Sequence, residues 1–157
     1  MWSTRPCDDV QNDVYELISG RPPADTFLKS NLKGEVGAVT TAKKATDGGK
    51  TVRKMDDDIE TPKGNTDIDV KLSDGTAIEV KNFDYADVTN RPQFMIDDEV
   101  SKLTAKLEKY SVESDSVVVA TRGNPESAEI PQRALNDADI SDGTTVEFKN
   151  IEDIDQL

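Results

Sequence analysis

The residues of this chain whose types and spacing could do chemistry lie in one stretch, 66–82, which reads TDIDVKLSDGTAIEVKN. Asp67 and Asp69 precede a Ser-Asp-Gly turn, and Glu79 and Lys81 follow it. Carboxylate oxygens are the ligands that hard divalent cations such as Mg²⁺ and Mn²⁺ prefer. The stretch therefore indicates chemistry carried by carboxylates, a lysine and a hard cation.

The composition excludes most other kinds of catalytic site. The chain has no histidine, which excludes Ser-His-Asp triads, histidine general bases and histidine metal sites. Its single cysteine, Cys7, can form neither an intramolecular disulfide nor a cysteine zinc cluster. Carboxylates, lysines, arginines and hydroxyls are the groups that remain for catalysis.

The length of the predicted hairpin turn decides which residues face each other. Alternate residues of a strand share one face, so Asp69 lies with Asp67, and the apolar residues between the charged ones take the other face. A two-residue Asp-Gly turn would set Asp69 opposite Val80 and mix the two faces. A three-residue loop sets Asp69 opposite Glu79 and matches them. We therefore predict a type I turn with Gly75 in the left-handed conformation of a G1 bulge.

The predicted pairing has an electrostatic cost. Asp69 and Glu79 repel each other across the strands, and burial would raise the pKa of at least one of them. Lys81 offsets part of this repulsion, and a divalent cation would offset more. The competing interpretation is a solvated strand face with scattered charges, Lys71 included.

The pattern formed by Asp69 in TDIDV with Glu79 and Lys81 in IEVK resembles the PD-(D/E)XK nuclease superfamily, also called restriction-endonuclease-like. The proline of the family name is absent, because Ile68 precedes Asp69 here. A glutamate on the preceding helix is a further family feature, and Glu35 in LKGEVGA fits it. The resemblance covers roughly residues 25–121 and implies an α/β fold: a mixed central sheet flanked by helices, with a core order of helix, three strands, helix and strand.

The resemblance implies phosphodiester hydrolysis with Mg²⁺ or Mn²⁺. The carboxylates of Asp69 and Glu79 and the backbone carbonyl of Val80 would hold the metal. Lys81 would position the attacking water and stabilise developing negative charge. Glu35 would orient a second metal or the lysine.

Two sets of site residues stay open alternatives. Asp67 lies on the same strand face as Asp69 and could replace it as a ligand, although Asp69 is the preferred one. Contacts to nucleic acid are expected from the next helix and from the basic stretch, at Gln93, Lys102, Lys43, Lys44 and Lys54.

The length of 157 residues predicts one domain, 1–157. Helix 8–19 would be an N-terminal extension, the core would cover about 25–122, and a helix and a strand would follow within 131–150. Within the core the patterns predict a helix at 25–46, strands at 50–55, 66–72, 77–81 and 116–121, a loop at 56–65 and a helix that begins near Pro92.

Apolar spacing predicts which helix faces are buried. In the helix at 25–46, capped by Asp25, the apolar side would be Phe27, Leu28, Leu32, Val36 and Val39. In the following helix one stripe would be Val100, Leu103, Leu107 and Tyr110, with Lys102, Lys106 and Lys109 facing elsewhere. The run SVVVAT predicts a central strand that is covered on both faces.

The net charge of −13 has two open explanations, a basic partner or adaptation to high salt. The charge is uneven. Residues 29–54 carry seven basic residues against two acids, a local net of +5, whereas 123–157 carry nine acids against two basic residues, a net of −7. The basic stretch is compatible with a phosphate-binding surface, and equally with a solvated helix face.

Two functions of different classes follow. The first is a metal-dependent endonuclease, of a toxin-type or stand-alone small kind, with nucleic acid as partner (DNA ahead of RNA) and a cognate inhibitor, an immunity protein or a second copy of the chain as further candidates. The alternative is a non-catalytic acidic binding module, an immunity protein or nucleic-acid mimic, that occupies a basic partner. No signal pattern or membrane-length apolar run is visible, so we expect no membrane partner and a cytoplasmic protein.

Overall fold

The computed structural model describes residues 26–125 and 128–157, with side chains described from residue 32 onward within these ranges. The expected helix 8–19, the expected cap Asp25 and the side chains of Phe27 and Leu28 therefore lie outside the described residues.

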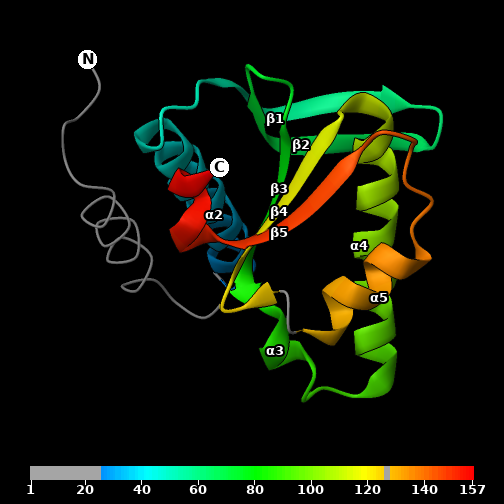
Figure 1. Ribbon diagram of the computed structural model, residues 1–157. Helices are drawn as coiled ribbons and strands as arrows, with labels where there is room; N and C mark the ends of the chain where they lie inside the picture. The colour runs from blue at the N-terminus through cyan, green and yellow to red at the C-terminus, as the bar shows by residue number, and fades with distance from the viewer. Residues whose placement is uncertain (1–25, 126–127) are drawn as a thin grey trace.

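The described chain forms a five-stranded mixed sheet flanked by helices, which confirms the expected α/β class (Figure 1). The elements in chain order are α2 (Thr26–Asp47), β1 (Val52–Thr61), β2 (Gly64–Leu72), β3 (Ala77–Asp84), α3 (Tyr85–Val88), α4 (Gln93–Glu113), β4 (Ser116–Arg122), α5 (Glu129–Asp137), β5 (Thr145–Asn150) and the 3₁₀ helix η3 (Ile151–Gln156). The strands lie in the order β1-β2-β3-β4-β5. The first three are antiparallel neighbours, and β3, β4 and β5 are parallel.

Helices cover both faces of the sheet and create two apolar cores (Figure 1). The α4-side core includes residues of α3, α4 and α5 packed on Ala77, Val117 and Val119. The α2-side core includes residues of α2 and η3 packed on Ile78 and Val118. Strand β4 contributes to both cores, which confirms its prediction as a strand covered on both faces. Among the described helices, none combines the length and apolar character that crossing a membrane requires.

Helix α2 uses small residues, and not the predicted apolar stripe, to approach the sheet. Val39 is 49% exposed, so its predicted burial is wrong, and Leu32 and Val36 are only partly buried. The residues that are buried on α2 are Gly37, Ala38, Thr40, Thr41, Ala42 and Ala45. Small side chains let the helix backbone come close to the strands, so close packing outweighs the greater hydrophobicity of valine.

Gly37 lies at the closest point of this approach, and we expect Gly37→Ala to destabilise the fold. A Cβ at position 37 would lie 2.7 Å from the Asn82 Cβ and 3.2 Å from the Val80 Cγ1. Such overpacking costs about 1–3 kcal/mol. Gly34 of the same helix has no atom within 4 Å of its Cβ position, so Gly34→Ala is the matched control. It should be stabilising by up to about 1 kcal/mol through helix propensity. Urea denaturation of both variants tests the difference, and equal effects would contradict the close packing.

Strand β1 is longer than predicted. The acidic segment expected to be a loop at 56–65 continues the strand to Thr61, and the hairpin to β2 closes with Thr61 paired to Gly64. The prediction was wrong because polarity alone suggested a loop. Strand β1 is an edge of the sheet, where charged side chains such as Asp56 and Asp58 can face solvent.

The hairpin between β2 and β3 has the predicted turn. Val70 pairs with Ile78 and Lys71 with Ala77, which is the register that requires a three-residue loop. The Gly75 amide donates to the Leu72 carbonyl, and Gly75 has a φ of +94°. The left-handed glycine therefore sets the register that brings the acidic residues of the two strands together.

Candidate functional site

The site forms where β2 and β3 leave the turn. The backbone pairing of β2 with β3 covers Lys71–Ala77 and Val70–Ile78, and Asp69 and Glu79 are the next residues beyond the Val70–Ile78 pair. The Val80 amide donates to Asp69 Oδ2 over 2.7 Å, so the carboxylate is fixed to the neighbouring strand. Glu79 is only 3% exposed, on the sheet face that α4 covers. Burial, followed by the charge of Glu79, raises the pKa of Asp69, so the two carboxylates lie close enough to repel each other, with Glu79 buried and Asp69 partly buried.

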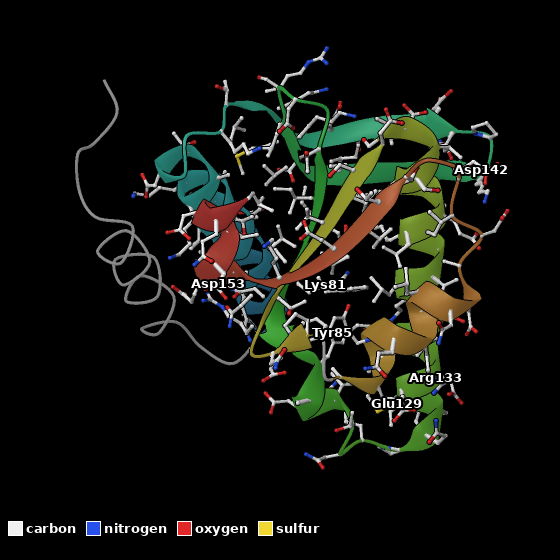
Figure 2. The ribbon with its side chains drawn as sticks, viewed as in Figure 1. Lys81, Tyr85, Glu129, Arg133, Asp142 and Asp153 are labelled. Carbon is white, nitrogen blue, oxygen red and sulfur yellow. The ribbon has the colours of Figure 1, made fainter. Side chains whose placement is uncertain are left out.

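Glu79 is held on both of its oxygens. Lys81 Nζ lies 2.7 Å from Oε1, and Figure 2 labels Lys81 in the middle of the view, beside the strands of the sheet. The Tyr110 hydroxyl donates to Oε2 over 2.7 Å, and Lys106 Nζ lies 3.6 Å from the same oxygen. Two ammonium groups and a hydroxyl thus stabilise one buried carboxylate, which fixes its orientation toward Asp69.

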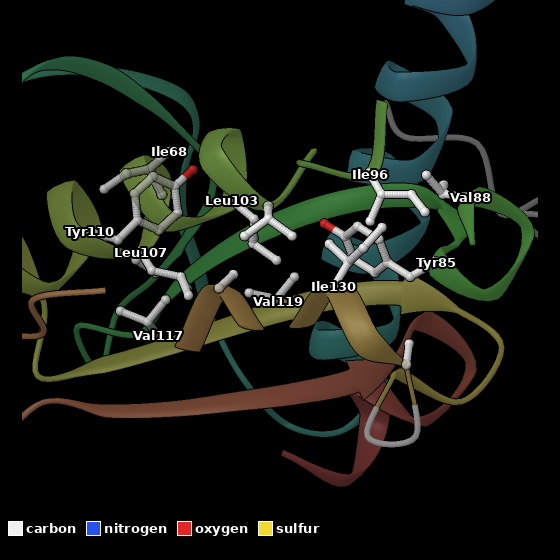
Figure 3. Close-up of a cluster of buried hydrophobic side chains, with 14 residues drawn as sticks. Ile68, Tyr85, Val88, Ile96, Leu103, Leu107, Tyr110, Val117, Val119 and Ile130 are labelled. Carbon is white, nitrogen blue, oxygen red and sulfur yellow. The ribbon is translucent and has the colours of Figure 1, made fainter. Parts of the chain in front are cut away.

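Tyr110 joins the site to the α4-side core. Its ring packs beside Ile68 (Figure 3), while its hydroxyl lies 2.6 Å from the Asp67 carbonyl as well as 2.7 Å from Glu79. One hydroxyl proton cannot serve both acceptors, so the bond to Glu79 competes with the bond to the backbone. Burial, followed by the charge of Glu79, raises the pKa of Tyr110, so it acts as a neutral donor.

Lys106 reaches the same cluster from α4. Its Nζ lies 2.7 Å from Asp67 Oδ1 and donates to the Asp67 carbonyl over 3.2 Å. The hydrogen bond from Lys106 lowers the pKa of Asp67, whereas its partial burial acts in the opposite direction. Asp67 is therefore an anchored, ionised partner of a lysine. This favours Asp69 over Asp67 as the carboxylate available to a cation.

Among these acidic residues, Asp69 is the one whose ionised form the surroundings disfavour. Burial, followed by the charge of Glu79, raises its pKa from 3.8 to about 7, although the Val80 amide and Lys106 act in the opposite direction. Asp67 also contributes a repulsive charge. The folded protein therefore disfavours the ionised form of Asp69 near neutral pH.

We expect Asp69→Asn to stabilise the metal-free protein at pH 8. A folded-state pKa above the unfolded value of 3.8 means that ionisation costs stability progressively between about pH 4 and pH 7, and fully above that window. The difference corresponds to at most about 4 kcal/mol at 1.4 kcal/mol per pH unit. Asparagine retains an oxygen that can accept from the Val80 amide.

Thermal melts from pH 4 to pH 8 test this expectation. The wild type should lose stability relative to Asp69→Asn as the pH rises, and the two should converge near pH 4. Asp58→Asn, at an exposed acid of β1, is the control and should follow the wild type. A stabilisation by Asp69→Asn that is the same at pH 4 and pH 8 would contradict the buried charge.

The structure does not bring every predicted site residue to the cluster. Glu35 is exposed on α2, which packs on the opposite sheet face, and no hydrogen bond or ion pair among the described residues joins it to Glu79 or Lys81. The candidates for nucleic-acid contact each have an acidic partner: Gln93 with Asp97, Lys102 with Asp98 and Glu99, Lys43 with Asp47, Lys44 with Glu152, and Lys54 with Asp57. Acidic residues thus offset the positive charge of the stretch 29–54.

Sequence reasoning missed the roles of Lys106 and Tyr110. The four residues predicted for the stripe of α4, Val100, Leu103, Leu107 and Tyr110, are buried, which confirms the stripe. Lys106 was expected to face elsewhere, and this was wrong. It lies four residues before Tyr110 and three after Leu103, so it borders the buried stripe. This spacing was the available signal that its ammonium could reach the sheet.

The candidate ligands are carboxylate and carbonyl oxygens, which are the ligand atoms that hard cations prefer. Among the described residues there is no group of three or more histidine, cysteine, aspartate or glutamate side chains placed to hold a metal. The set that the resemblance implies needs only two carboxylates, Asp69 and Glu79, with a backbone carbonyl. Burial and then the charge of Glu79 raise the pKa of Asp69, and a divalent cation would relieve the repulsion between the two carboxylates.

Comparisons with known proteins return no relative. No family model, no curated protein and no solved structure matches the chain. The contacts, burial and charges of the described residues are therefore what supports a function.

Proposed function

We propose that this chain is a divalent-metal-dependent nuclease that hydrolyses phosphodiester bonds in nucleic acid. The single observation that carries the proposal is a buried Glu79 bound to Lys81 at 2.7 Å, next to a partly buried Asp69 that the adjacent strand holds through the Val80 amide. Carboxylates that repel each other beside a lysine destabilise the folded state. Groups with such perturbed pKa values cluster at functional sites.

The arrangement of elements supports the finer, restriction-endonuclease-like form of the fold. Helix α2 precedes an antiparallel meander of three strands, and β4 then follows α4 to pair in parallel with β3. This sequence of elements agrees with the order that the resemblance implies. It supplies a reason for the position of the site, because the meander brings β2 and β3 together at their charged residues.

The residues have separable parts in the proposed reaction. Asp69, Glu79 and the Val80 carbonyl would hold Mg²⁺ or Mn²⁺, which when bound polarises phosphate and lowers the pKa of a water. Lys81 is held by Glu79 at 2.7 Å and is partly exposed, so its ammonium is fixed beside the carboxylates while open to a substrate. There it would orient a water and stabilise charge on the phosphate. Tyr110 positions Glu79 through its hydrogen bond.

Cleavage of defined substrates tests the proposal. Supercoiled plasmid, linear duplex DNA, single-stranded DNA and RNA are each incubated with the protein in Mg²⁺, in Mn²⁺ and in excess chelator. We expect cleavage in the presence of either metal and none with chelator, with DNA preferred. Cleavage that persists in chelator, or no cleavage of any substrate over a range of salt concentrations, would contradict it.

A second candidate function is a non-catalytic acidic module that binds a basic partner. The observation that favours it is the net charge of −13 together with the pairing of the predicted phosphate-contact lysines to acids. Such a module would bind a basic protein with an affinity that falls as salt rises. It would bind no nucleic acid, and this separates it from the nuclease.

A further inference from the structure

Lys106 stands out because its ammonium lies among the carboxylates of the site. It is 2.7 Å from Asp67 Oδ1 and 3.6 Å from Glu79 Oε2, and its side chain is 24% exposed. It approaches from α4 and lies beside Oε2 of Glu79, whereas the strand lysine, Lys81, contacts Oε1. A positively charged group of the chain itself thus already lies beside two of the carboxylates of the site.

The other lysines of α4 show that this placement is specific to one position. Lys102 is exposed and pairs with Asp98 and Glu99 of its own helix. Lys109 donates to the Asn65 carbonyl at the far end of β2. Only the position one turn before Tyr110 directs an ammonium group at Glu79 among these three lysines.

We propose that Lys106 is a tethered counter-cation that substitutes for the divalent cation when the metal is absent, and that it competes with the metal for the carboxylates. The inference rests on the metal site of the proposed function and deepens it, because it assigns that site a built-in competitor. A unit charge about 4 Å from a carboxylate attracts it, and a metal that displaces this charge must replace the attraction.

The geometry shows how the exchange can occur without unfolding. Lys106 makes its two shorter contacts with Asp67, to the carboxylate at 2.7 Å and to the carbonyl at 3.2 Å. Its contact with Glu79 is the longer one. Of the contacts that Lys106 makes, a cation that binds Glu79 therefore needs to displace only this longer one, and Asp67 retains the lysine beside the site.

Calorimetric titration of the full chain with Mn²⁺ tests the competition. Lys106→Gln removes the charge and keeps an amide that can bond to Asp67, Lys106→Arg keeps the charge, and Lys102→Gln is the matched control on the same helix. We expect Lys106→Gln to bind Mn²⁺ about tenfold more tightly than the wild type, since a repelling charge is removed. Lys106→Arg and Lys102→Gln should bind as the wild type does.

Thermal melts test the proposal even if Lys106→Gln is less stable than the wild type without metal. That variant should melt at a lower temperature than the wild type in chelator and should gain more from Mn²⁺ than the wild type gains. An unchanged or weaker Mn²⁺ affinity of Lys106→Gln, with no larger gain in melting temperature, would overturn the counter-cation role.

Cleavage assays on the wild type separate this inference from the proposed function. If the wild type binds Mn²⁺ and cleaves while Lys106→Gln binds no more tightly, the counter-cation inference alone fails. If Lys106→Gln binds more tightly but the wild type cleaves nothing, the nuclease proposal alone fails. If neither protein binds Mn²⁺, both are overturned.

Discussion

Lys81→Ala is expected to lower the cleavage rate by about 10²- to 10³-fold, which is the scale of removing one group that stabilises the transition state. The fold should survive, because the Lys81 side chain is 25% exposed and its partner Glu79 keeps the hydrogen bond from Tyr110. Metal binding should persist, since the lysine is not a ligand. The loss should therefore appear in kcat at saturating Mg²⁺.

Lys71→Ala is the matched control for this change. Lys71 lies on β2 in the same hairpin, but its ammonium bonds to Ser114 and the Glu113 carbonyl, away from the carboxylate pair. Its loss should leave cleavage within a few-fold of the wild type. Equal rates for Lys81→Ala and the wild type, or equal losses for the two lysine variants, would show that Lys81 has only a structural part.

Glu79→Gln is expected to have the largest effect on the metal. It removes a proposed ligand while keeping the size of the side chain and an oxygen that can accept from Tyr110. Mn²⁺ affinity should fall by more than about 100-fold, beyond the effect of changing an indirect neighbour of a ligand, and cleavage should be lost. Calorimetry and the plasmid assay measure the two effects.

The stability of Glu79→Gln without metal distinguishes a functional site from a structural ion pair. Loss of this carboxylate removes the repulsion on Asp69, and Lys81, being 25% exposed, can turn to solvent. The melting temperature in chelator should therefore hold or rise. Glu113→Gln, at an exposed acid of α4, is the control and should match the wild type. A Glu79→Gln variant that melts much lower and still cleaves would identify the Glu79–Lys81 pair as structural.

The hairpin could be predicted from the sequence because its determinants are local. The Ser-Asp-Gly loop with a left-handed Gly75 fixes the register beside the turn. The predicted alternation of faces is wrong further along β2, because Ile68 packs in the α4-side core whereas Val70 packs in the α2-side core. The stripe of α4 was predictable for a similar reason, since helical spacing fixes a face without knowledge of its partner.

The predictions from the sequence were wrong where contacts between elements distant in the chain determine the structure. Val39 is exposed because α2 presents its small residues to the sheet, which no hydrophobic pattern reveals. The acids of β1 lie in a strand because β2 supplies backbone partners. Helix η3 was not predicted, although Ile151 and Ile154 are fully buried against α2. Lys106 was assigned to the surface because its acidic partners are far away in sequence.

The central claim is that Asp69 and Glu79 together hold a divalent cation beside Lys81. Anomalous diffraction from a crystal of the wild-type chain soaked in Mn²⁺ tests it most directly. The account predicts one manganese peak within coordination distance of a carboxylate oxygen of Asp69, a carboxylate oxygen of Glu79 and the Val80 carbonyl. Manganese bound only elsewhere, or absent from these two carboxylates at a concentration that supports cleavage, would contradict it.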